Sequence, residues 1–562
     1  MELIMSKTSI PKALSLAALA LSASACSKTD KKEDARPNIL VILADDLGYS
    51  DIGCYGGEIN TPNLDKLAQN GIRFTRFYNA GRSCPTRASL LTGLYPHEAG
   101  VGRMTFDEHQ PGYRGTMTHN GVTIAEALKG AGYETGMVGK WHVAETPLRP
   151  DQRQWLAHQV YHEEFAPKEN YPTHRGFDQF YGTIYGVVNY FDPFSLVNGE
   201  KPVRTVPENY YSTIALADTA VAYINRYAKT ENPFFMYLSF HSPHWPLHAL
   251  PEDIKKYEDT YTKGWDDIRE KRYKRIKEMG LFEGSDDFLS ARQFTDTWED
   301  NPTKEWDARA MAVHAAMIDR MDKEIGKVIK SLEETGQLEN TLILFMSDNG
   351  CSNENCQNYS EGENDRPAEM RNGEKIIYPR EKEILPGPQN TYASIGPRWA
   401  NVANTPFRFW KAKSYEGGVC TPMIAHWPKG MKKGKGTITT AQGHVIDLMP
   451  TFLELSGAEY PTQYNGNDII PYAGVSLVST ITKGEATPKR DLGFEHFNER
   501  ALIDNEGWKI VRTARGKEWE LYNLNEDRTE IHNLAAQYPE RVNQMEQRYL
   551  NWEKAHMVEP RP

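Results

Sequence analysis

Acidic and amide side chains follow two apolar runs that lie far apart in the sequence. Asp45 and Asp46 come directly after the first run, and Asp348 and Asn349 follow the second after one serine. Three carboxylates and one amide oxygen are hard ligands, which suit Ca²⁺ or Mg²⁺ and do not suit zinc. Each acid alone could instead cap the helix after its strand. Two such pairs favour one divalent cation, and we expect Ca²⁺, with Mg²⁺ as the second choice.

Five basic side chains could hold a tetrahedral anion against that cation. They are Arg87, Lys140, His142, His244 and Lys411. Lys140 and His142 stand at alternate positions after a predicted strand, so both can point into one cleft. Any one of these residues alone is more often an ordinary surface or core residue. The five together favour an anion-binding site.

A small nucleophile, Ser83, stands two residues before Pro85 and four before Arg87, within G-R-S-C-P-T-R-A-S-L-L-T-G. The same letters also describe an ordinary turn into a helix, since Ser and Pro often begin helices and residues 88–91 favour one. Both interpretations can hold at once. A pattern with three fixed positions recurs by chance, so the rest of the chain must decide.

Strand and helix patterns alternate along the chain, and the polar residues stand where strands end. The apolar run at 39–44 is unbroken, which is typical of a strand buried on both faces. Further strands are predicted at 73–78, 135–138, 234–240 and 341–346, and helices at 61–71, 122–130 and 308–338. This alternation predicts an α/β fold with a large, mostly parallel central sheet flanked by helices, which binds ligands at the carboxyl ends of its strands.

Three stretches break the alternation. Residues 251–309 are dense in Lys, Glu, Asp and Trp and are interpreted as a solvated helical excursion. Residues 353–406 are polar and rich in Gly and Pro, and we expect a loop over the site. After about residue 490 short strands and a helix at 539–555 predict a small C-terminal α+β subdomain. The expected division is a catalytic domain at 37–490 and a subdomain at 491–562.

The composition is that of a globular protein with ample length for a large core: 562 residues, 39% hydrophobic and 25% charged. The net charge of -11 argues against nucleic acid as a partner. Six cysteines show no repeated C-x-x-C spacing, so a zinc site is not indicated. Cys351 and Cys356 could form a disulfide or remain free.

The first residues have the pattern of an export signal. Lys7 and Lys12 precede an apolar stretch at 13–21 that is too short to span a bilayer, and small residues follow. We therefore expect a signal peptide at 1–25 and a tether at 26–36. Ordinary cleavage fits these residues, but the charged tether favours a lipid anchor at Cys26. The expected location is the periplasm or outer membrane of a bacterium.

The stretch at Ser83 resembles the signature S-x-P-x-R of the type I sulfatases, in the alkaline-phosphatase-like superfamily. Matching pieces elsewhere are NILVILADDLGYSD, GKWH, HRGFDQFYG, HSPH, SDNG and KAKSYEGG, and the resemblance reaches from Pro37 to the C-terminal ELYNL. It is strongest to the bacterial arylsulfatase-like branch. It implies the hydrolysis of an aryl or carbohydrate sulfate ester.

In this family the first motif residue is oxidised to formylglycine, which the resemblance assigns to Ser83. A motif starting at Cys84 would need Pro at 86 and Arg at 88, where this chain has Thr86 and Ala88. Serine at the modified position implies a radical-type, oxygen-independent maturase that acts before export.

The resemblance also implies the role of each site residue. Arg87 would steady the formylglycine hydrate, and Lys140 and Lys411 would neutralise the sulfate. His244, with or without Lys411, would protonate the leaving alcohol, and His142 would take the proton whose loss expels sulfate and restores the aldehyde. The implied ligands of the cation are Asp45, Asp46, Ser83, Asp348 and Asn349.

Two other functions stay open on the sequence. A phosphonate or phosphate ester hydrolase of the same superfamily would share the fold and the metal. A non-catalytic, glycan-binding surface lipoprotein would result if Ser83 were never oxidised. The leaving group is not indicated, and we expect its pocket in the variable loops at 103–115, 150–210 and 353–406.

Overall fold

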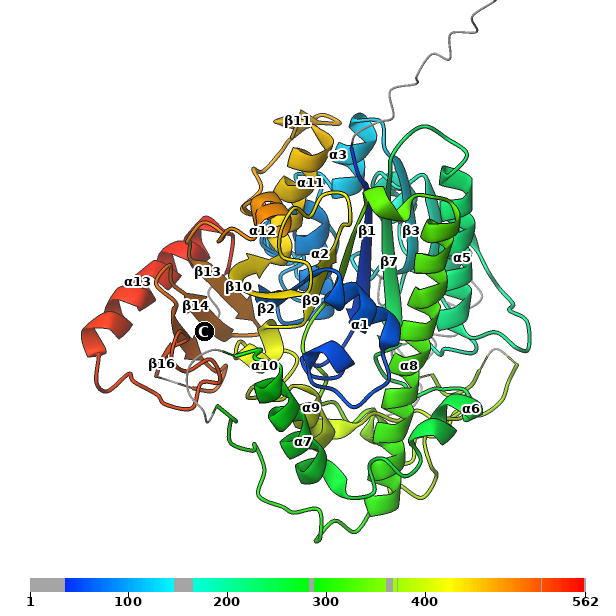
Figure 1. Ribbon diagram of the computed structural model, residues 1–562, viewed down its shortest axis with the longest axis vertical. Coiled ribbons are helices and arrows are strands. Elements are labelled where there is room, and N and C mark those ends of the chain that lie inside the picture. The colour runs from blue at the N-terminus through cyan, green and yellow to red at the C-terminus, as the bar shows by residue number, and fades with distance from the viewer. Residues whose placement is uncertain are drawn as a thin grey trace, which may run out of the picture.

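The computed structural model describes residues 36–145, 165–282, 288–359, 367–370, 372–516 and 518–559. In this part of the chain a ten-stranded sheet forms the centre of the molecule (Figure 1). In spatial order its strands are β10 (Thr437–His444), β2 (Ile72–Tyr78), β9 (Met423–His426), β8 (Thr341–Ser347), β1 (Asn38–Asp45), β7 (Phe234–Pro243), β3 (Glu134–Lys140), β4 (Gln179–Thr183), β5 (Leu196–Asn198) and β6 (Lys201–Pro202).

The first strand, β1, lies in the middle of this sheet and runs parallel to both of its neighbours, β7 and β8. Every residue from Ile39 to Asp45 is buried, as the unbroken apolar run predicts. β3 and β4 extend the parallel arrangement. β9 runs antiparallel to β2 and β8, and β5 and β6 are antiparallel to their neighbours. The predicted sheet is therefore confirmed, parallel at its centre and mixed elsewhere.

Helices cover both faces of the sheet, and successive residues of β1 contact opposite layers, as side chains of a strand must. Leu40 and Ile42 belong to one hydrophobic cluster, and Ile39 and Val41 belong to the other. The first cluster includes residues of α1 (Pro62–Gln69), α5 (Ser212–Tyr227) and α8 (Lys304–Glu334), and the second includes residues of α2 (Ser83–Thr92), α3 (Ile124–Gly130) and α11 (Leu448–Ser456). Figure 1 shows these two layers on either side of the strands.

The charged stretch at 251–309 is helical only in part. It contains α6 (Pro251–Ile254) and α7 (Gly264–Glu278), whereas its residues 288–303 form no helix, and α8 begins at Lys304. The interpretation of a solvated excursion is wrong for α7, because Trp265, Ile268 and Ile276 are buried. These apolar side chains on one face dock the helix onto the body of the protein.

The stretch at 353–406 was expected to be a loop, and this prediction is wrong for its last part. Residues 396–403 form α9 (Gly396–Ala403), with a proline in its first turn. Trp399 is fully buried, and its indole donates a hydrogen bond to the Asp307 carbonyl at 2.8 Å. The described residues before α9 are mostly irregular.

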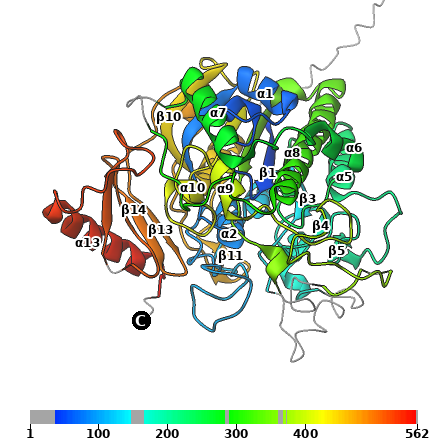
Figure 2. The same cartoon turned by 90° about the horizontal axis from the view of Figure 1, so that it is seen from below.

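A second, antiparallel sheet follows the main sheet and forms the predicted small C-terminal α+β subdomain, at the β10 side of the molecule (Figures 1 and 2). The strand β13 was not predicted, because its run of apolar residues is short. The elements from residue 463 onward are β11 (Gln463–Tyr464), β12 (Asn467–Asp468), α12 (Val478–Lys483), β13 (Leu492–His496), β14 (Glu499–Ile503), β15 (Trp508–Arg512), β16 (Glu520–Asn523) and α13 (Pro539–Ala555).

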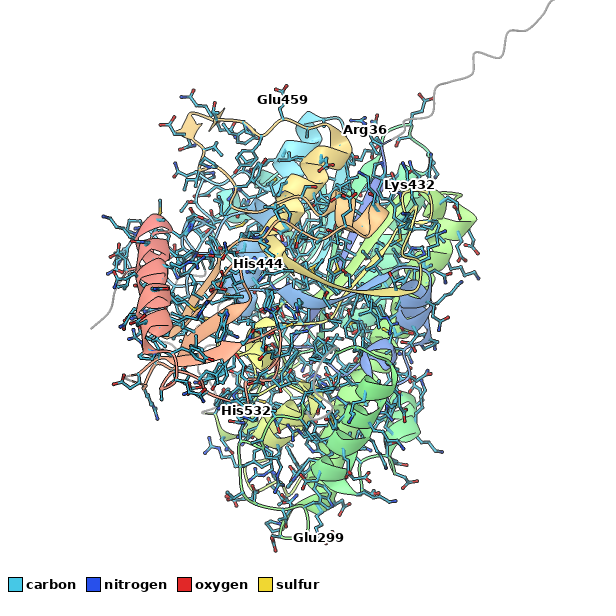
Figure 3. The ribbon with its side chains drawn as sticks, turned by 60° about the vertical axis from the view of Figure 1, so that its left-hand side comes forward. Arg36, Glu299, Lys432, His444, Glu459 and His532 are labelled. Carbon is cyan, nitrogen blue, oxygen red and sulfur yellow. The ribbon has the colours of Figure 1, made fainter. Side chains whose placement is uncertain are left out.

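His444, at the end of β10, lies where the two sheets meet (Figure 3). Its ring centroid is 5.9 Å from that of Phe494 on β13 and 6.1 Å from that of Tyr95. Burial lowers the pKa of His444 to about 3, so the ring is neutral at ordinary pH. The junction at this point therefore contains aromatic rings and an uncharged imidazole.

A buried ionic cluster forms a second junction. Lys509 of β15 lies 3.0 Å from Glu416 of the short helix α10 (Glu416–Val419) and 2.8 Å from Glu530. Glu530 also accepts a hydrogen bond from the Glu416 amide at 3.0 Å. The C-terminal subdomain thus holds the segment that begins at Lys411.

The expected signal peptide, the tether and Cys26 lie outside the described residues. Among the described helices none is long and apolar enough to cross a membrane. The cysteines of the described chain are all free, so Cys351 and Cys356 are not paired.

Candidate active site

All ten predicted site residues are buried, and contacts link them into one group at the carboxyl ends of β1, β3, β7 and β8. Parallel strands end at the same edge of a sheet, which explains why residues far apart in sequence meet here. The group comprises Asp45, Asp46, Ser83, Arg87, Lys140, His142, His244, Asp348, Asn349 and Lys411.

Ser83 is the first residue of α2, and Arg82 before it has an extended backbone. The helical interpretation and the nucleophile interpretation of this stretch therefore hold together. The Ser83 hydroxyl donates to Asp45 Oδ1 at 3.0 Å and is also within hydrogen-bonding contact of Asp348 Oδ2. The positive end of the α2 dipole lies at Ser83, where it would favour a bound anion.

The four predicted oxygen ligands lie together at the ends of β1 and β8, which are neighbours in the sheet. Asp46 has a left-handed backbone with φ 65°, so the chain turns directly after β1. Its amide donates to Asp348 Oδ1 at 3.2 Å, and Asn349 Nδ2 donates to Asp46 Oδ1 at 2.6 Å. Oxygens of Asp45 and Asp46 and a nitrogen of His244 lie within 4.8 Å of one another.

This donor set fits a hard divalent cation. Asn349 Oδ1 is buried and has no hydrogen-bond partner in the described part of the chain. An unsatisfied buried acceptor is unfavourable, and a cation would satisfy it. The other predicted ligands, from Asp45, Asp46 and Asp348, are carboxylate oxygens, which Ca²⁺ and Mg²⁺ prefer.

Arg87 and Lys140 surround the Ser83 hydroxyl with positive charge. Arg87 donates to Asp348 Oδ2 through Nη2 at 2.8 Å and through Nε at 3.1 Å. Lys140 Nζ contacts Asp45 Oδ2 and lies 3.4 Å from Ser83 Oγ. Burial lowers the pKa of Lys140, although Asp45 raises it. These two side chains can neutralise charge that develops beside Ser83.

Lys411 and His244 share the carboxylate of Asp46. Lys411 Nζ lies 2.8 Å from Oδ1, and His244 Nε2 lies 3.5 Å from Oδ2. His244 Nδ1 faces the Trp245 carbonyl at 2.5 Å, and because a carbonyl only accepts, Nδ1 carries a proton. Burial lowers the pKa of His244, although Asp46 raises it. Burial would also lower the pKa of Lys411, but Asp46 and Glu354 raise it.

His142 follows β3 with a left-handed backbone, φ 56°. Its Nε2 lies 3.2 Å from the sulfur of Cys84, the residue after Ser83, and its buried Nδ1 has no hydrogen-bond partner within the described ranges. Burial, and then the charges of Lys140 and Arg87, lower the pKa of His142 well below its ordinary value. A neutral imidazole in this place can accept a proton.

Sequence reasoning missed Glu354 and Arg82, which border the site. Glu354 accepts a hydrogen bond from the Trp245 indole at 3.1 Å and lies 3.6 Å from Lys411 and 3.9 Å from Arg82. Burial alone would raise the pKa of Glu354, but Lys411 and Arg82 hold it well below its ordinary value. Glu354 belongs to no motif, so the sequence carried no signal for it.

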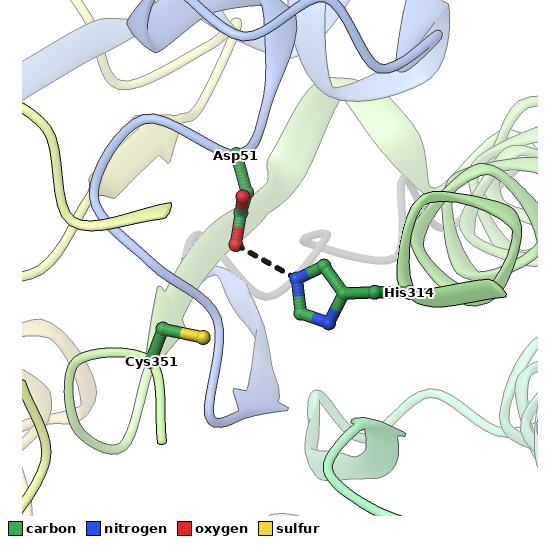
Figure 4. A group of neighbouring side chains, drawn as sticks. All are labelled: Asp51, His314 and Cys351. Carbon is green, nitrogen blue, oxygen red and sulfur yellow. Dashed lines mark hydrogen bonds and ion pairs between the residues drawn. The ribbon is translucent and has the colours of Figure 1, made fainter. Parts of the chain in front are cut away.

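A second compact group of possible ligands, Asp51, His314 and Cys351, is shown in Figure 4. Asp51 already accepts hydrogen bonds from Arg272 at 2.7 Å and from the Gly48 amide at 2.9 Å, and it lies 3.1 Å from His314 Nε2. Burial, with Asp51 nearby, keeps the pKa of the Cys351 thiol well above its ordinary value. With its carboxylate bound to a guanidinium, this group holds the loop after β1 in place.

Comparisons with known proteins extend over most of the chain. Residues 37–458 match the family model described as Sulfatase, and residues 407–555 match that of the N-sulphoglucosamine sulphohydrolase C-terminal region. An uncharacterized sulfatase of Schizosaccharomyces pombe is 32% identical over 554 residues, covering 93% of this chain and 94% of that protein. An arylsulfatase of Klebsiella aerogenes is 33% identical over 465 residues, covering 82% of this chain and 94% of that protein. An N-acetylglucosamine-6-O-sulfatase of Bacteroides thetaiotaomicron is 26% identical over 600 residues, covering 96% and 90%.

Solved structures share the fold at lower identity. Ps i-CgsB in complex with k-i-k-neocarrahexaose has a TM-score of 0.64 at 24% identity, covering 93% of this chain and 94% of that one. A protein in complex with D-glucosamine-2-N,6-O-disulfate has a TM-score of 0.57 at 20% identity, covering 93% and 98%. The phosphonate monoester hydrolase of Agrobacterium radiobacter has a TM-score of 0.52 at 20% identity, covering 93% and 96%. These similarities confirm the predicted fold class.

Proposed function

Because the chain belongs to the sulfatase family and is a sulfatase enzyme, we propose that it releases sulfate from an aryl or carbohydrate sulfate ester through a formylglycine formed from Ser83. The observation that carries this proposal is the position of Ser83. Its hydroxyl contacts two carboxylates, Asp45 and Asp348, and lies 3.4 Å from the ammonium of Lys140. The oxygen of Ser83 thus lies next to both the candidate cation ligands and the groups that could bind an anion.

The side chains around Ser83 would bind and orient the ester. Arg87 holds Asp348 in place through two hydrogen bonds, and Lys140 and Lys411 would neutralise the sulfate oxygens. A bound cation, which we propose to be Ca²⁺ with Mg²⁺ as the second choice, would polarise an oxygen of the sulfate and the hydroxyl derived from Ser83. The proposed ligands are Asp45, Asp46, Asp348, Asn349 and the oxygen of the modified Ser83.

The two histidines would move the protons of the reaction. His244 would donate a proton to the leaving alcohol, because it lies beside Lys411 and Asp46 on the side of β7. His142 would accept a proton from the modified Ser83 side chain, because its neutral ring lies against Cys84, the neighbouring residue. Release of sulfate would then restore the aldehyde for the next cycle.

We propose that a maturase modifies the enzyme before export and that the enzyme acts in the periplasm or at the outer membrane. Serine at position 83 favours a radical-type maturase, and the first 26 residues have the pattern of an exported lipoprotein anchored at Cys26. We also propose that the catalytic domain ends near residue 490, where the C-terminal subdomain begins.

The direct test is to produce the protein with a radical-type sulfatase maturase and to offer 4-nitrophenyl sulfate, N-acetylglucosamine 6-sulfate and 4-nitrophenyl phosphate. We expect hydrolysis of at least one sulfate ester, formylglycine at position 83 by peptide mass spectrometry, and no activity in Ser83→Ala. Activity confined to the phosphate ester would favour a phosphate or phosphonate hydrolase. Full activity with an intact serine at position 83 would overturn the proposed nucleophile.

A further inference from the structure

Arg82, the residue before Ser83, carries a guanidinium with unused hydrogen-bonding capacity. Its side chain is 22% exposed, and within the described chain it makes no side-chain hydrogen bond. Its one ion contact is to Glu354, at 3.9 Å. A guanidinium has five N–H donors in a planar fork that matches a carboxylate or a sulfate. Arg82 is therefore available to an anionic ligand beside the nucleophile.

The contact with Glu354 does not use the hydrogen-bonding capacity of the Arg82 guanidinium. The carboxylate of Glu354 accepts from the Trp245 indole at 3.1 Å, from the Tyr359 hydroxyl at 3.1 Å and from the Ser352 hydroxyl at 2.8 Å. Its acceptors are thus satisfied by closer partners than Arg82. The distance of 3.9 Å is too long for the charge-assisted hydrogen bond that a committed pair would form.

A buried imidazole of the C-terminal subdomain, that of His496, has a pKa that the charge of Arg82 affects. His496, at the end of β13, is 3% exposed. Burial and then the charge of Arg82 lower the pKa of His496 to about 3, with the backbone of Gly102 partly offsetting this effect. The imidazole is therefore neutral and adds no positive charge to that of Arg82.

The turn after His496 is the two-residue hairpin loop that joins β13 to β14. Phe497 and Asn498 both have left-handed backbones, with φ 50° and 65°. Phe497 is 46% exposed, and the guanidinium of Arg103 lies 5.1 Å from its ring centroid. Positive φ at both central residues is what a two-residue hairpin of type I′ requires, so these dihedrals follow from the turn.

We infer that Arg82 binds a second anionic group on the leaving group of the substrate, either a carboxylate or a second sulfate. The inference rests on the proposed function of Ser83. The reacting sulfate is left to Lys140 and Lys411, since Arg82 makes no contact with the carboxylates that hold Ser83. The preferred substrates are therefore acidic sulfate esters.

The test compares matched pairs of esters that differ in one negative charge. The first pair is 3-carboxyphenyl sulfate and 3-carbamoylphenyl sulfate, and the second is N-sulfoglucosamine 6-sulfate and N-acetylglucosamine 6-sulfate. We expect the wild type to favour the more acidic ester of at least one pair, which also identifies the group as carboxylate or sulfate. Arg82→Gln should lower kcat/KM for that ester roughly tenfold, as loss of one charge-assisted pair predicts, and leave its neutral partner within about twofold.

Two variants serve as controls. Lys413→Gln removes a nearby cation that is already paired with Glu499 at 2.5 Å, so it should leave the preference unchanged. Arg82→Lys keeps the charge but loses the planar fork, so it should fall between wild type and Arg82→Gln. Equal losses on both esters of each pair in Arg82→Gln, or a wild type without preference for the acidic esters, would overturn the inference.

A binding experiment separates this inference from the proposed function. In Ser83→Ala protein, calorimetric titration with 3-carboxyphenyl sulfate and with N-sulfoglucosamine 6-sulfate measures recognition without turnover. Adding Arg82→Gln should weaken the binding of the acidic ester roughly tenfold. Unchanged affinity for both esters refutes the role of Arg82, whereas weakened binding in an enzyme that hydrolyses no sulfate ester refutes only the proposed function.

Discussion

His244 approaches the site from the end of β7, where Asp46 and Lys411 lie beside it. If it protonates the leaving alcohol, an ester with a poor leaving group needs it more than an activated one. His244→Ala should therefore slow hydrolysis of a sugar sulfate by roughly 10² or more and that of 4-nitrophenyl sulfate far less. Steady-state kinetics on both esters measures the difference. Equal losses on both would remove His244 from the role of general acid.

His142 follows another strand, β3, and its Nε2 lies 3.2 Å from the sulfur of Cys84. If it accepts the proton whose loss expels sulfate, His142→Ala should slow turnover of both ester classes to a similar extent. Enzyme carrying covalent sulfate should then accumulate, which intact mass measurement after acid quenching would detect. Cys84→Ala is the matched control, since it removes the neighbour of the imidazole and keeps the base. A slow His142→Ala enzyme without trapped sulfate would contradict this assignment.

The sequence was informative about residues that belong to motifs and silent about those that do not. Ser83, Asp348 and Lys411 could be predicted because their types and spacing resemble a family pattern. Arg82 and Glu354 could not, because their importance depends on which loops pack against each other. A side chain's unused donors are visible only when its surroundings are known.

At the scale of elements, the loop between β1 and α1 positions two of the proposed cation ligands. Asp51 fixes this loop from inside through Arg272 of α7 and the Gly48 amide, and through His314 of α8, whose contact with Asp51 is drawn in Figure 4. All three side chains are buried. The network therefore connects the middle of α7 and the first half of α8 to the strand end that carries Asp45 and Asp46.

We expect Asp51→Asn to destabilise the protein by about 1.5–3 kcal/mol, because the buried guanidinium of Arg272 loses one of its two carboxylate partners and keeps the other, Glu58. The free energy of unfolding from urea titration measures the effect. Asp267→Asn is the matched control, since it breaks a surface pair with Lys271 on the same α7 and should cost less than about 1 kcal/mol. A loss in Asp51→Asn no greater than in the control would show that the network does not stabilise the fold.

Elements with a clear apolar run or helical period in their own sequence were predictable. Elements whose apolar face depends on what packs against them were not. β1, β7 and β8 are continuous apolar runs, and α8 has a clear helical period. α9 was missed because its eight residues lie in a polar stretch rich in Gly and Pro, and only burial of Trp399 reveals its packing face.

At the scale of the whole molecule, the C-terminal subdomain contributes to the site in two ways. Its first turn brings His496 within electrostatic range of Arg82. Its strand β15 brings Lys509 to Glu416, five residues after Lys411. The surroundings of Arg82 and the placement of Lys411 thus both depend on how the two sheets are joined.

The ionic cluster at this junction predicts a dependence of stability on pH. Burial raises the pKa of Glu530 to about 7, and Glu416 adds to the rise, although Lys509 opposes it. The pKa of a glutamate in an unfolded chain is about 4.3, so between these values the folded protein binds more protons than the unfolded one. The stabilisation by protonated Glu530 is complete below the pKa of the unfolded chain. It is lost as pH rises through the pKa of the folded protein.

Glu530→Gln keeps an acceptor for the Glu416 amide and removes the titration. We expect the free energy of unfolding of the wild type, relative to this variant, to fall steadily between about pH 4.5 and 7.5, as measured by urea titration at each pH. Glu526→Gln, an exposed position on the same turn, should give a difference that does not change with pH. A flat or rising difference for Glu530→Gln would mean that this carboxyl is ionised throughout and that Lys509 dominates its surroundings. A stability difference that falls with pH would show that the contact between the C-terminal subdomain and the Lys411 segment depends on protonation of Glu530.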